Sequence, residues 1–249
     1  MMSPKTAGRL VGAAFLMAYL VYLTGGALVE AATGTPTELS RVAEHQLQIG
    51  VGALLMLANS VFVVAIGVLV FPAIVRHDAL AARTYVAARV IEAVLLGVGV
   101  LSLLTLIPLA RASDQATTDA AAGAAEALGQ VIPEVNQTAI QIGMIALGIG
   151  SLLFCRALAR AQIVPRLVAV WGGLGYLILA VGEAGGILGY SGMLHYAVGG
   201  VFEVFLGIWL LVTGFPDGAP RSPSGGPFRG ETIARRGRPG PRRSPRILQ

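Results

Sequence analysis

Two carboxylates lie inside the last long apolar stretch of the chain, where charged side chains are rare. Glu183 and Glu203 are the only acidic residues between Leu167 and Pro216. An ionised side chain at the centre of a membrane-spanning helix costs roughly 2.5 to 3.5 kcal/mol on insertion scales, so such a residue usually faces protein or water. Glu203 would lie about ten residues, or roughly 15 Å, into a helix that begins near Leu194. We therefore treat both acids as candidates for binding a proton or a ligand.

Other polar side chains are spaced so that they would converge with these acids. Two sets follow helical spacing and would each share one helix face: Gln137, Gln141, Met144 and Gly148, and Gln48, Gly52, Leu55 and Asn59. A polar pocket open to the outer side would satisfy them all. The alternative is that each one hydrogen-bonds a neighbouring helix, which contributes about 0.6 kcal/mol on average. The candidate ligand- or proton-binding residues are Glu203, Glu183, Asn59, Gln141, Tyr19, Tyr22 and His195.

Proton transfer is the more specific chemistry that Glu203 suggests. The predicted spans hold no cationic side chain at a comparable depth, which disfavours the ionised carboxylate. We expect this carboxyl to be neutral part of the time and therefore able to relay protons. Arg89 and Glu92 are three residues apart, nearer the expected cytoplasmic interface, and predict an interfacial ion pair there.

Sequence motifs for catalysis are absent, since the chain has no HExxH, GxSxG, GxxxxGK or CxxC pattern. Predicted topology puts His45 and His195 near the outer face and His77 in a cytoplasmic loop, so the three cannot share one metal ion. We predict no metal, no cofactor and no enzymatic activity. The single cysteine, Cys155, is interpreted as a packing residue.

Apolar stretches long enough to cross a membrane would position these side chains. The chain is 55% hydrophobic and 12% charged, with a mean hydropathy of +0.74, which is typical of a membrane protein. The uncharged stretches are Leu10 to Val29, Gln46 to Val75, Ala93 to Ala110, Val135 to Cys155, and a Leu167 to Pro216 block that is long enough for two spans. We predict an all-α bundle of six transmembrane helices over residues 1–215, with glycine pairs such as Gly8 and Gly12 or Gly182 and Gly186 allowing close helix packing or forming a homo-oligomer seam.

Basic residues alternate between high and low numbers along the connections, which predicts orientation. Lys5 and Arg9 precede the first stretch, whereas Arg41 and Arg111 are the only basic residues of the first and third connections. We therefore expect both termini in the cytoplasm and loops 30–45, 111–134 and 189–193 outside. This pattern fits a multi-pass membrane protein in contact with the lipid bilayer.

The last part of the chain carries a net charge of +6, more than the +5 of the whole chain, so the rest is about neutral. Residues 216–249 hold eight arginines against two acids and seven prolines, so we expect a disordered cytoplasmic tail rather than a nucleic-acid-binding domain. The arginines would hold the tail on anionic lipid at about 1 kcal/mol each. The alternative is that they only retain the C-terminus inside.

Three local strings resemble a bacterial membrane family catalogued as domain of unknown function 4386. They are Thr84–Ala93 (TYVAARVIEA), Val164–Arg166 followed by Trp171–Gly172, and Glu203–Leu210 (EVFLGIWL) running to Gly214–Phe215. The resemblance implies a six-helix bacterial membrane protein over residues 5 to 215, which we expect in the inner membrane, and it supplies no activity. From the residues themselves we favour a small-molecule or proton-coupled transporter or binder, then an accessory protein acting through partner helices, and last an intramembrane enzyme.

Overall fold

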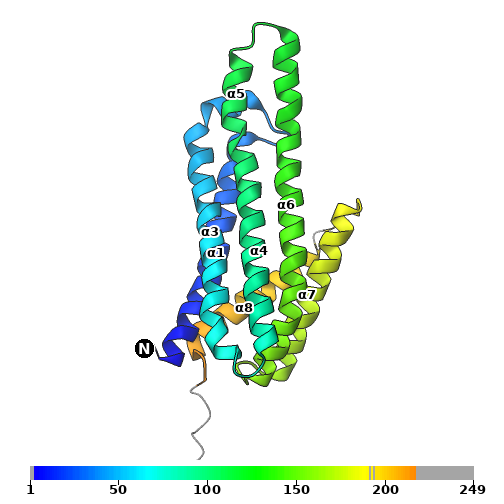
Figure 1. The fold of residues 1–249 in the computed structure, drawn as a ribbon. Coiled ribbons are helices and arrows are strands. Elements are labelled where there is room, and N and C mark those ends of the chain that lie inside the picture. Colours follow the sequence, from blue (N-terminus) through cyan, green and yellow to red (C-terminus); the bar gives the residue numbers. More distant parts are fainter. Residues whose placement is uncertain (1–2, 191, 193, 217–249) are drawn as a thin grey trace, which may run out of the picture. The chain divides into compact units, whose positions relative to one another are not determined.

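The computed structural model describes residues 3–190, 192 and 194–216, and every element in them is a helix. In chain order they are α1 (Pro4–Thr33), α2 (Leu39–Glu44), α3 (Gln46–Ile74), α4 (Ala79–Leu104), α5 (Leu106–Asp114), α6 (Asp119–Arg160), α7 (Arg166–Ile187) and α8 (Leu194–Thr213) (Figure 1). The predicted tail lies outside the described residues. Its boundary at residue 215 and its lipid contacts therefore stay predictions.

Local sequence explains where several helices begin. Three of them start with a side-chain cap, in which Ser3, Asp78 and Thr118 accept the backbone N–H three residues later at 3.0 to 3.3 Å. Pro4 occupies the first turn of α1, where no intrahelical N–H bond is lost. At Thr105 the backbone N–H bonds the Ser102 carbonyl instead of continuing the α-helical pattern, so α4 ends there and α5 follows directly.

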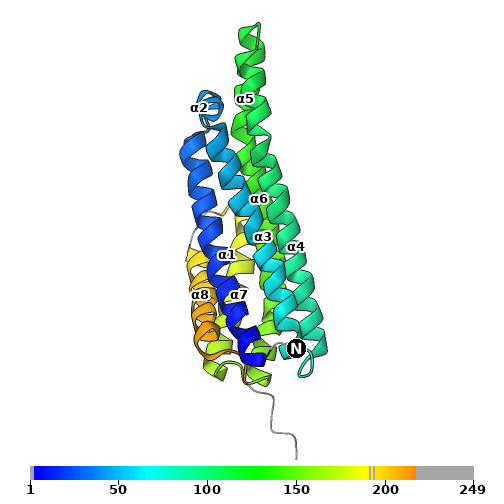
Figure 2. The ribbon, with the colours of Figure 1, turned by 90° about the vertical axis from the view of Figure 1, so that its left-hand side faces the viewer.

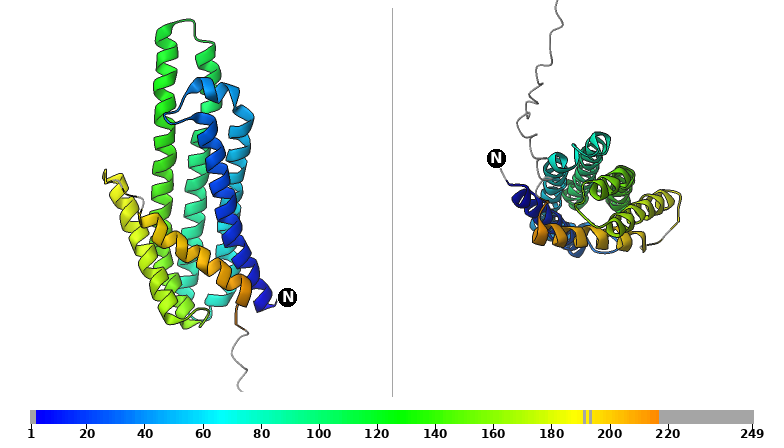
Figure 3. Two further views of the ribbon diagram at one scale, coloured as in Figure 1. Left: turned by 180° about the vertical axis from the view of Figure 1, so that it is seen from behind. Right: turned by 90° about the horizontal axis from the view of Figure 1, so that it is seen from below.

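Six long helices form a closed ring. Each packs against the next in the order α1, α3, α4, α6, α7, α8 and back to α1, and the view along the helices shows them arranged around a centre (Figure 3). Figure 2 shows α1, α3 and α4 side by side along one wall of this ring. Side chains on the inner faces of all six helices therefore point toward a shared interior.

Close helix packing depends on glycine at several crossings. A Cβ at Gly12 of α1 would lie 2.5 Å from the Gly207 carbonyl oxygen of α8, and one at Gly25 would lie 2.6 Å from the Gly52 carbonyl oxygen of α3. Gly8 likewise lies against the backbone of Gly214. The expectation that Gly8 and Gly12 bring two helices together is confirmed, and the partner is α8 of the same chain.

Five helical segments are long and apolar enough to cross a membrane: α1, α3, α4 with α5, α6 and α7. The chain is therefore a multi-pass membrane protein. The sixth long helix, α8, runs obliquely across α1 (Figure 3), and its apolar part, Ala197–Thr213, is shorter than a typical span. At 1.5 Å per residue, the 20 residues of α8 reach about 30 Å along the helix axis.

The expectation that residues 111–134 form a loop is wrong. Helix α6 begins at Asp119 and continues without interruption to Arg160, so residues 119–134 are helical and only residues 115–118 connect α5 to α6. Its 42 residues correspond to about 63 Å, roughly twice the hydrocarbon thickness of a bilayer. Figure 1 shows α5 and the start of α6 reaching past the other helices, above α2. The search for uncharged apolar stretches did not predict this, because residues 119–134 are rich in alanine and include three acids.

Candidate ligand cavity and its buried charge network

Arg89 is the centre of a buried polar network inside the ring. Tyr85, Arg89 and Glu92 follow the spacing i, i+4, i+7 and share the inner face of α4. The Arg89 Nε donates to the Tyr85 hydroxyl at 2.9 Å, and Nη1 donates to Glu92 Oε2 at 3.0 Å. Nη2 donates to Glu203 Oε1 of α8 at 2.6 Å. Only 2% of the Arg89 surface is exposed, so one guanidinium is held by two carboxylates away from water.

Both carboxylate oxygens of Glu203 accept hydrogen bonds in this network. Its Oε1 also accepts from the Tyr176 hydroxyl of α7 at 2.6 Å, and its Oε2 accepts from the Tyr19 hydroxyl of α1 at 3.1 Å. Arg89, Tyr176 and Glu203 each lie about ten residues from an end of their helix, which places them at a common depth. The network therefore joins α1, α4, α7 and α8 near the middle of the ring.

Aromatic rings surround the guanidinium. The Arg89 Cζ lies 5.3 Å from the centre of the Phe15 ring and 5.2 Å from that of Tyr85, within the range of cation–π attraction. Tyr85 in turn stacks on Phe154 of α6, with ring centres 3.9 Å apart. For the ion pairs of Arg89 with Glu92 and Glu203, removing one charged partner typically costs about 3 to 5 kcal/mol, because the other charge then stays buried without a partner.

These contacts correct two expectations. Arg89 and Glu92 do form an ion pair, but both are buried within the ring rather than at the interface. The expectation that Glu203 has no cation at its depth is wrong, because Arg89 lies 2.6 Å away. Both errors have one cause: the third span was expected to begin at Ala93, whereas α4 begins at Ala79, so Arg89 lies about 15 Å into the helix.

A cavity of about 810 Å³ lies against this network. One end of its lining consists of the charged and tyrosine side chains of the network, which are Arg89, Glu92, Glu203, Tyr19 and Tyr176. Apolar side chains form much of the rest. Those apolar residues are Phe15, Ala18, Leu23, Val63, Ile66, Leu96, Ile140, Met144, Leu147 and Leu179. The cavity thus combines apolar walls with a charged floor.

Every residue proposed from the sequence as a ligand or proton site lines this one cavity. These residues are Glu203, Glu183, Asn59, Gln141, Tyr19, Tyr22 and His195, and Gln137 and Met144 join them. Gln48 does not line it; instead its side-chain amide donates to the Leu28 carbonyl of α1 at 3.0 Å. The structure therefore brings the candidates together, whereas their role in binding stays a prediction. Sequence reasoning missed Arg89, Glu92 and Tyr176 as lining residues, although the Tyr85, Arg89, Glu92 spacing was a usable signal.

Glu183 and His195 form the second polar group of the lining, away from Arg89. The His195 Nε2 lies 3.5 Å from Glu183 Oε1, and only 1% of Glu183 is exposed. None of the described residues donates a hydrogen bond to Glu183 Oε1. Gly182 makes room for the His195 ring, which a Cβ at that position would overlap. This carboxylate is therefore less well satisfied than Glu203.

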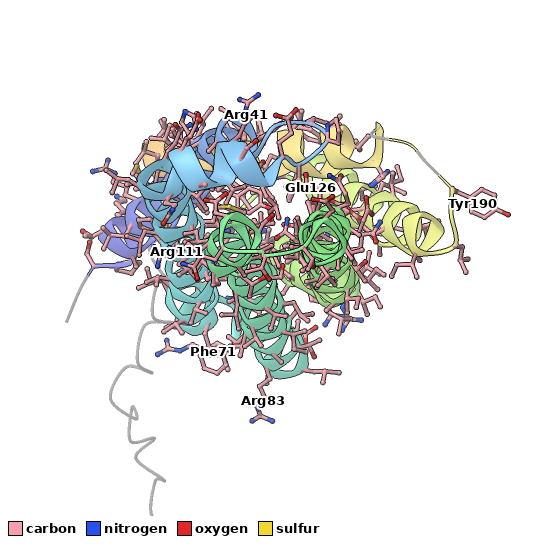
Figure 4. The ribbon with its side chains drawn as sticks, turned by 90° about the horizontal axis from the view of Figure 1, so that it is seen from above. Arg41, Phe71, Arg83, Arg111, Glu126 and Tyr190 are labelled. Atoms are coloured by element: carbon pink, nitrogen blue, oxygen red, sulfur yellow. The ribbon has the colours of Figure 1, made fainter. Side chains whose placement is uncertain are left out.

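The cavity reaches the connection between α7 and α8. Gly186, Gly189, Tyr190 and Gly192 complete its lining there. Figure 4 shows Tyr190 at the edge of the ring, on this connection, and the residue is largely exposed. The cavity therefore runs from the buried Arg89 network toward the end of the ring where α7 meets α8. Among the described residues, no group of three or more His, Cys, Asp or Glu side chains is arranged to hold a metal ion.

Comparison with known proteins identifies the family of the chain. A family model described as Domain of unknown function (DUF4386) matches residues 10–214. No curated protein and no solved structure matches the chain. Because the family model spans most of the chain, the protein belongs to this family.

Proposed function

We propose that this protein binds a small molecule in the central cavity and carries it into or across the membrane. The observation that carries the proposal is the cavity of about 810 Å³ enclosed by the six-helix ring and ending on a charged floor. Ligand pockets usually measure about 300 to 1,000 Å³, with mostly apolar walls and a few placed polar groups. The volume and the lining both fit that description.

Structural hydrogen bonding alone does not account for the cavity. The Arg89 network would hold the same four helices together if apolar side chains filled the space above it. Protein interiors are normally packed to a density that leaves few voids larger than a water molecule. Gln48, by contrast, fits the structural alternative, because its amide bonds another helix outside the cavity.

Topology completes the proposal. We propose six spans with both termini in the cytoplasm of a bacterial cell, so that the α7–α8 connection and the cavity opening lie on the outer side. Support comes from the alternating basic residues of the connections. The length of α8, about 30 Å along its axis, is enough to count it as the sixth span.

An enzymatic role is not part of the proposal. None of the described lining residues is a serine, threonine, cysteine or lysine, the usual nucleophiles of covalent catalysis. Two of the three lining carboxylates, Glu92 and Glu203, are already held by Arg89. A binder or carrier needs neither a nucleophile nor an unpaired pair of catalytic carboxylates.

The test is ligand-induced stabilisation of the purified full-length protein in lipid nanodiscs. Three apolar probes represent the charge classes: tetraphenylphosphonium, Nile red and 8-anilinonaphthalene-1-sulfonate. Binding to the folded state raises the melting temperature. We expect at least one probe to do so in the wild type, and the shift to disappear in Met144→Trp, which fills part of the cavity.

The matched control is Val94→Trp, which adds the same ring on the exposed face of α4, outside the cavity. It should keep the wild-type shift. Absence of a shift with all three probes, or equal shifts in both tryptophan variants, would contradict a ligand-binding cavity.

A further inference from the structure

We propose that the ligand is an apolar organic cation whose charged end binds Glu183. This inference rests on the proposed function and names the ligand class of the same cavity. It depends on three observations: the charge of the lining, the different hydrogen bonding of its carboxylates, and the chemistry of its walls.

Acidic groups outnumber permanent cations in the lining. Apart from tyrosines, its described ionisable residues are three acids, Glu92, Glu183 and Glu203, and two bases, Arg89 and His195. Arg89 is the permanent cation, and it already shares its charge between Glu92 and Glu203. A ligand entering the cavity therefore meets an excess of negative charge, which attracts cations and repels anions.

Glu183 is the carboxylate that remains available to a ligand. Glu203 accepts three hydrogen bonds, from Arg89, Tyr176 and Tyr19, and so both of its oxygens are occupied. Glu183 is as deeply buried, yet within the described residues no hydrogen bond reaches its Oε1, and the His195 Nε2 lies 3.5 Å from that oxygen. A buried carboxylate oxygen without a hydrogen bond is costly. A ligand cation placed beside it would offset that cost.

The walls select an organic cation over a metal ion. Hard cations such as Mg²⁺ and Ca²⁺ need about six or more oxygen ligands, whereas the described residues hold no cluster of three metal-ligating side chains. The walls instead present the rings of Phe15, Tyr22 and Tyr176 and several aliphatic side chains. Aromatic faces attract organic ammonium groups, and aliphatic side chains bury an apolar body.

The experiment compares two molecules of the same shape and different charge. Benzyltrimethylammonium is a permanent cation, and neopentylbenzene replaces its nitrogen by carbon. Affinity for the full-length protein in nanodiscs is measured from the shift in melting temperature. We expect the cation to bind at least tenfold more tightly than its neutral counterpart. Equal affinities would overturn the assignment of a cation.

Glu183→Gln keeps the size of the side chain and removes its charge. We expect this variant to weaken the binding of benzyltrimethylammonium at least tenfold and to leave that of neopentylbenzene unchanged. The matched control is Glu30→Gln, which removes an exposed carboxylate of α1 outside the cavity and should bind both molecules as the wild type does. Wild-type affinity for the cation in Glu183→Gln would overturn the role of Glu183.

A measurement on the wild type covers the case in which Glu183→Gln does not fold. Dicyclohexylcarbodiimide modifies carboxyls in apolar surroundings, and mass spectrometry locates the product. We expect benzyltrimethylammonium to protect Glu183 from modification, and unchanged modification would overturn the proposal. If Nile red or the sulfonate binds in the cavity and the cation does not, the ligand class is wrong while the proposed function stands.

Discussion

Replacing Glu203 by glutamine or by leucine distinguishes the contribution of its hydrogen bonds to stability from that of its charge. Glutamine keeps one acceptor for Arg89 and Tyr176 and leaves the guanidinium paired with Glu92, so we expect a loss of about 1 to 2 kcal/mol in stability. Leucine removes every acceptor and leaves Nη2 of Arg89 buried without a partner, so we expect a loss of about 3 to 5 kcal/mol. Denaturant unfolding in detergent micelles measures both.

The same pair of variants addresses proton transfer through Glu203. With Arg89 at 2.6 Å, the carboxylate has a positive partner that the sequence did not reveal. If Glu203 relays protons, proton-coupled flux measured in vesicles should stop in a folded Glu203→Gln variant. Unchanged flux in that variant would contradict a relay at Glu203. A leucine variant as stable as the wild type would contradict the network described above, because it would show that Arg89 does not need this acceptor.

For individual residues, the sequence predicted which side chains line the cavity better than it predicted which side chains contact one another. Glu203, Glu183 and Asn59 were found because polar residues are rare in apolar stretches, and all three line the cavity. Arg89 was placed at the interface because an apolar stretch marks the uncharged part of a helix, not its beginning. Tyr176 gave no signal, since a tyrosine in a span is compatible with many positions.

Among the helices, the crossing of α1 and α8 requires a glycine at position 12. A Cβ at Gly12 would lie 2.5 Å from both the Gly207 carbonyl oxygen and the Leu211 backbone nitrogen, and backbone atoms cannot rotate away. We expect Gly12→Leu to separate the two helices and to lower the melting temperature strongly. Limited proteolysis of α8 should accelerate in parallel.

Gly26 provides a control on the same helix. A Cβ there meets no atom within 4 Å, so Gly26→Leu should leave the melting temperature close to that of the wild type. Similar losses in both variants would contradict a specific crossing and would indicate a general intolerance of α1 to leucine.

Asp78 joins the start of α4 to the end of α6. It accepts the Ala81 N–H at 3.0 Å and pairs with Arg156 at 2.7 Å and Arg160 at 3.1 Å. The Ala81 N–H first, and then the two arginines, lower the pKa of this carboxyl below its usual 3.8. Because the folded protein favours the ionised form, its stabilisation is present above the usual pKa and is lost as the pH falls through the lowered value.

Asp78→Asn should therefore reduce stability modestly at neutral pH, since asparagine still caps the helix while the ion pairs are lost. The difference from the wild type should shrink at high salt and vanish as the pH falls through the lowered pKa of Asp78. Melting curves across pH and salt measure it. A difference that stays constant down to the lowest pH would contradict the electrostatic explanation.

The helices themselves were largely predictable, and their ends were not. Length and hydropathy identified six long helices, because the apolar stretches are about long enough to cross the hydrocarbon core of a bilayer. The extension of α6 over residues 119–134 was missed for a physical reason: alanine favours helix strongly without adding to an apolar stretch, and Asp119 suits the positive end of the helix dipole. Hydropathy measures solvent preference, whereas helix length here follows from propensity and capping.

For the whole protein, the closed ring explains how one chain can hold a cavity and a buried charge together. Each helix is packed on two sides by its neighbours, so the inner faces are free to present polar groups without exposing them to lipid. Outer faces carry exposed aliphatic side chains such as Leu54, Val61 and Val94. The two ends of the interior therefore differ. The Arg89 network lies at mid-depth, and in the described residues the cavity lining continues from it only toward the α7–α8 connection.

This difference gives the last prediction, which concerns the side of the membrane on which the cavity opens. In a Cys155→Ala background, cysteines are introduced at Thr117, between α5 and α6, at Gln137 in the cavity lining, and at His77, between α3 and α4; all three positions are exposed. On intact cells, a membrane-impermeant thiol reagent should label Thr117→Cys and Gln137→Cys and leave His77→Cys unlabelled until the membrane is opened. An apolar cation that occupies the cavity should slow labelling at position 137 and not at 117. Labelling of His77→Cys alone would invert the orientation. Labelling of Thr117→Cys without Gln137→Cys would instead mean that the orientation is right and that the cavity is closed to the outer solution.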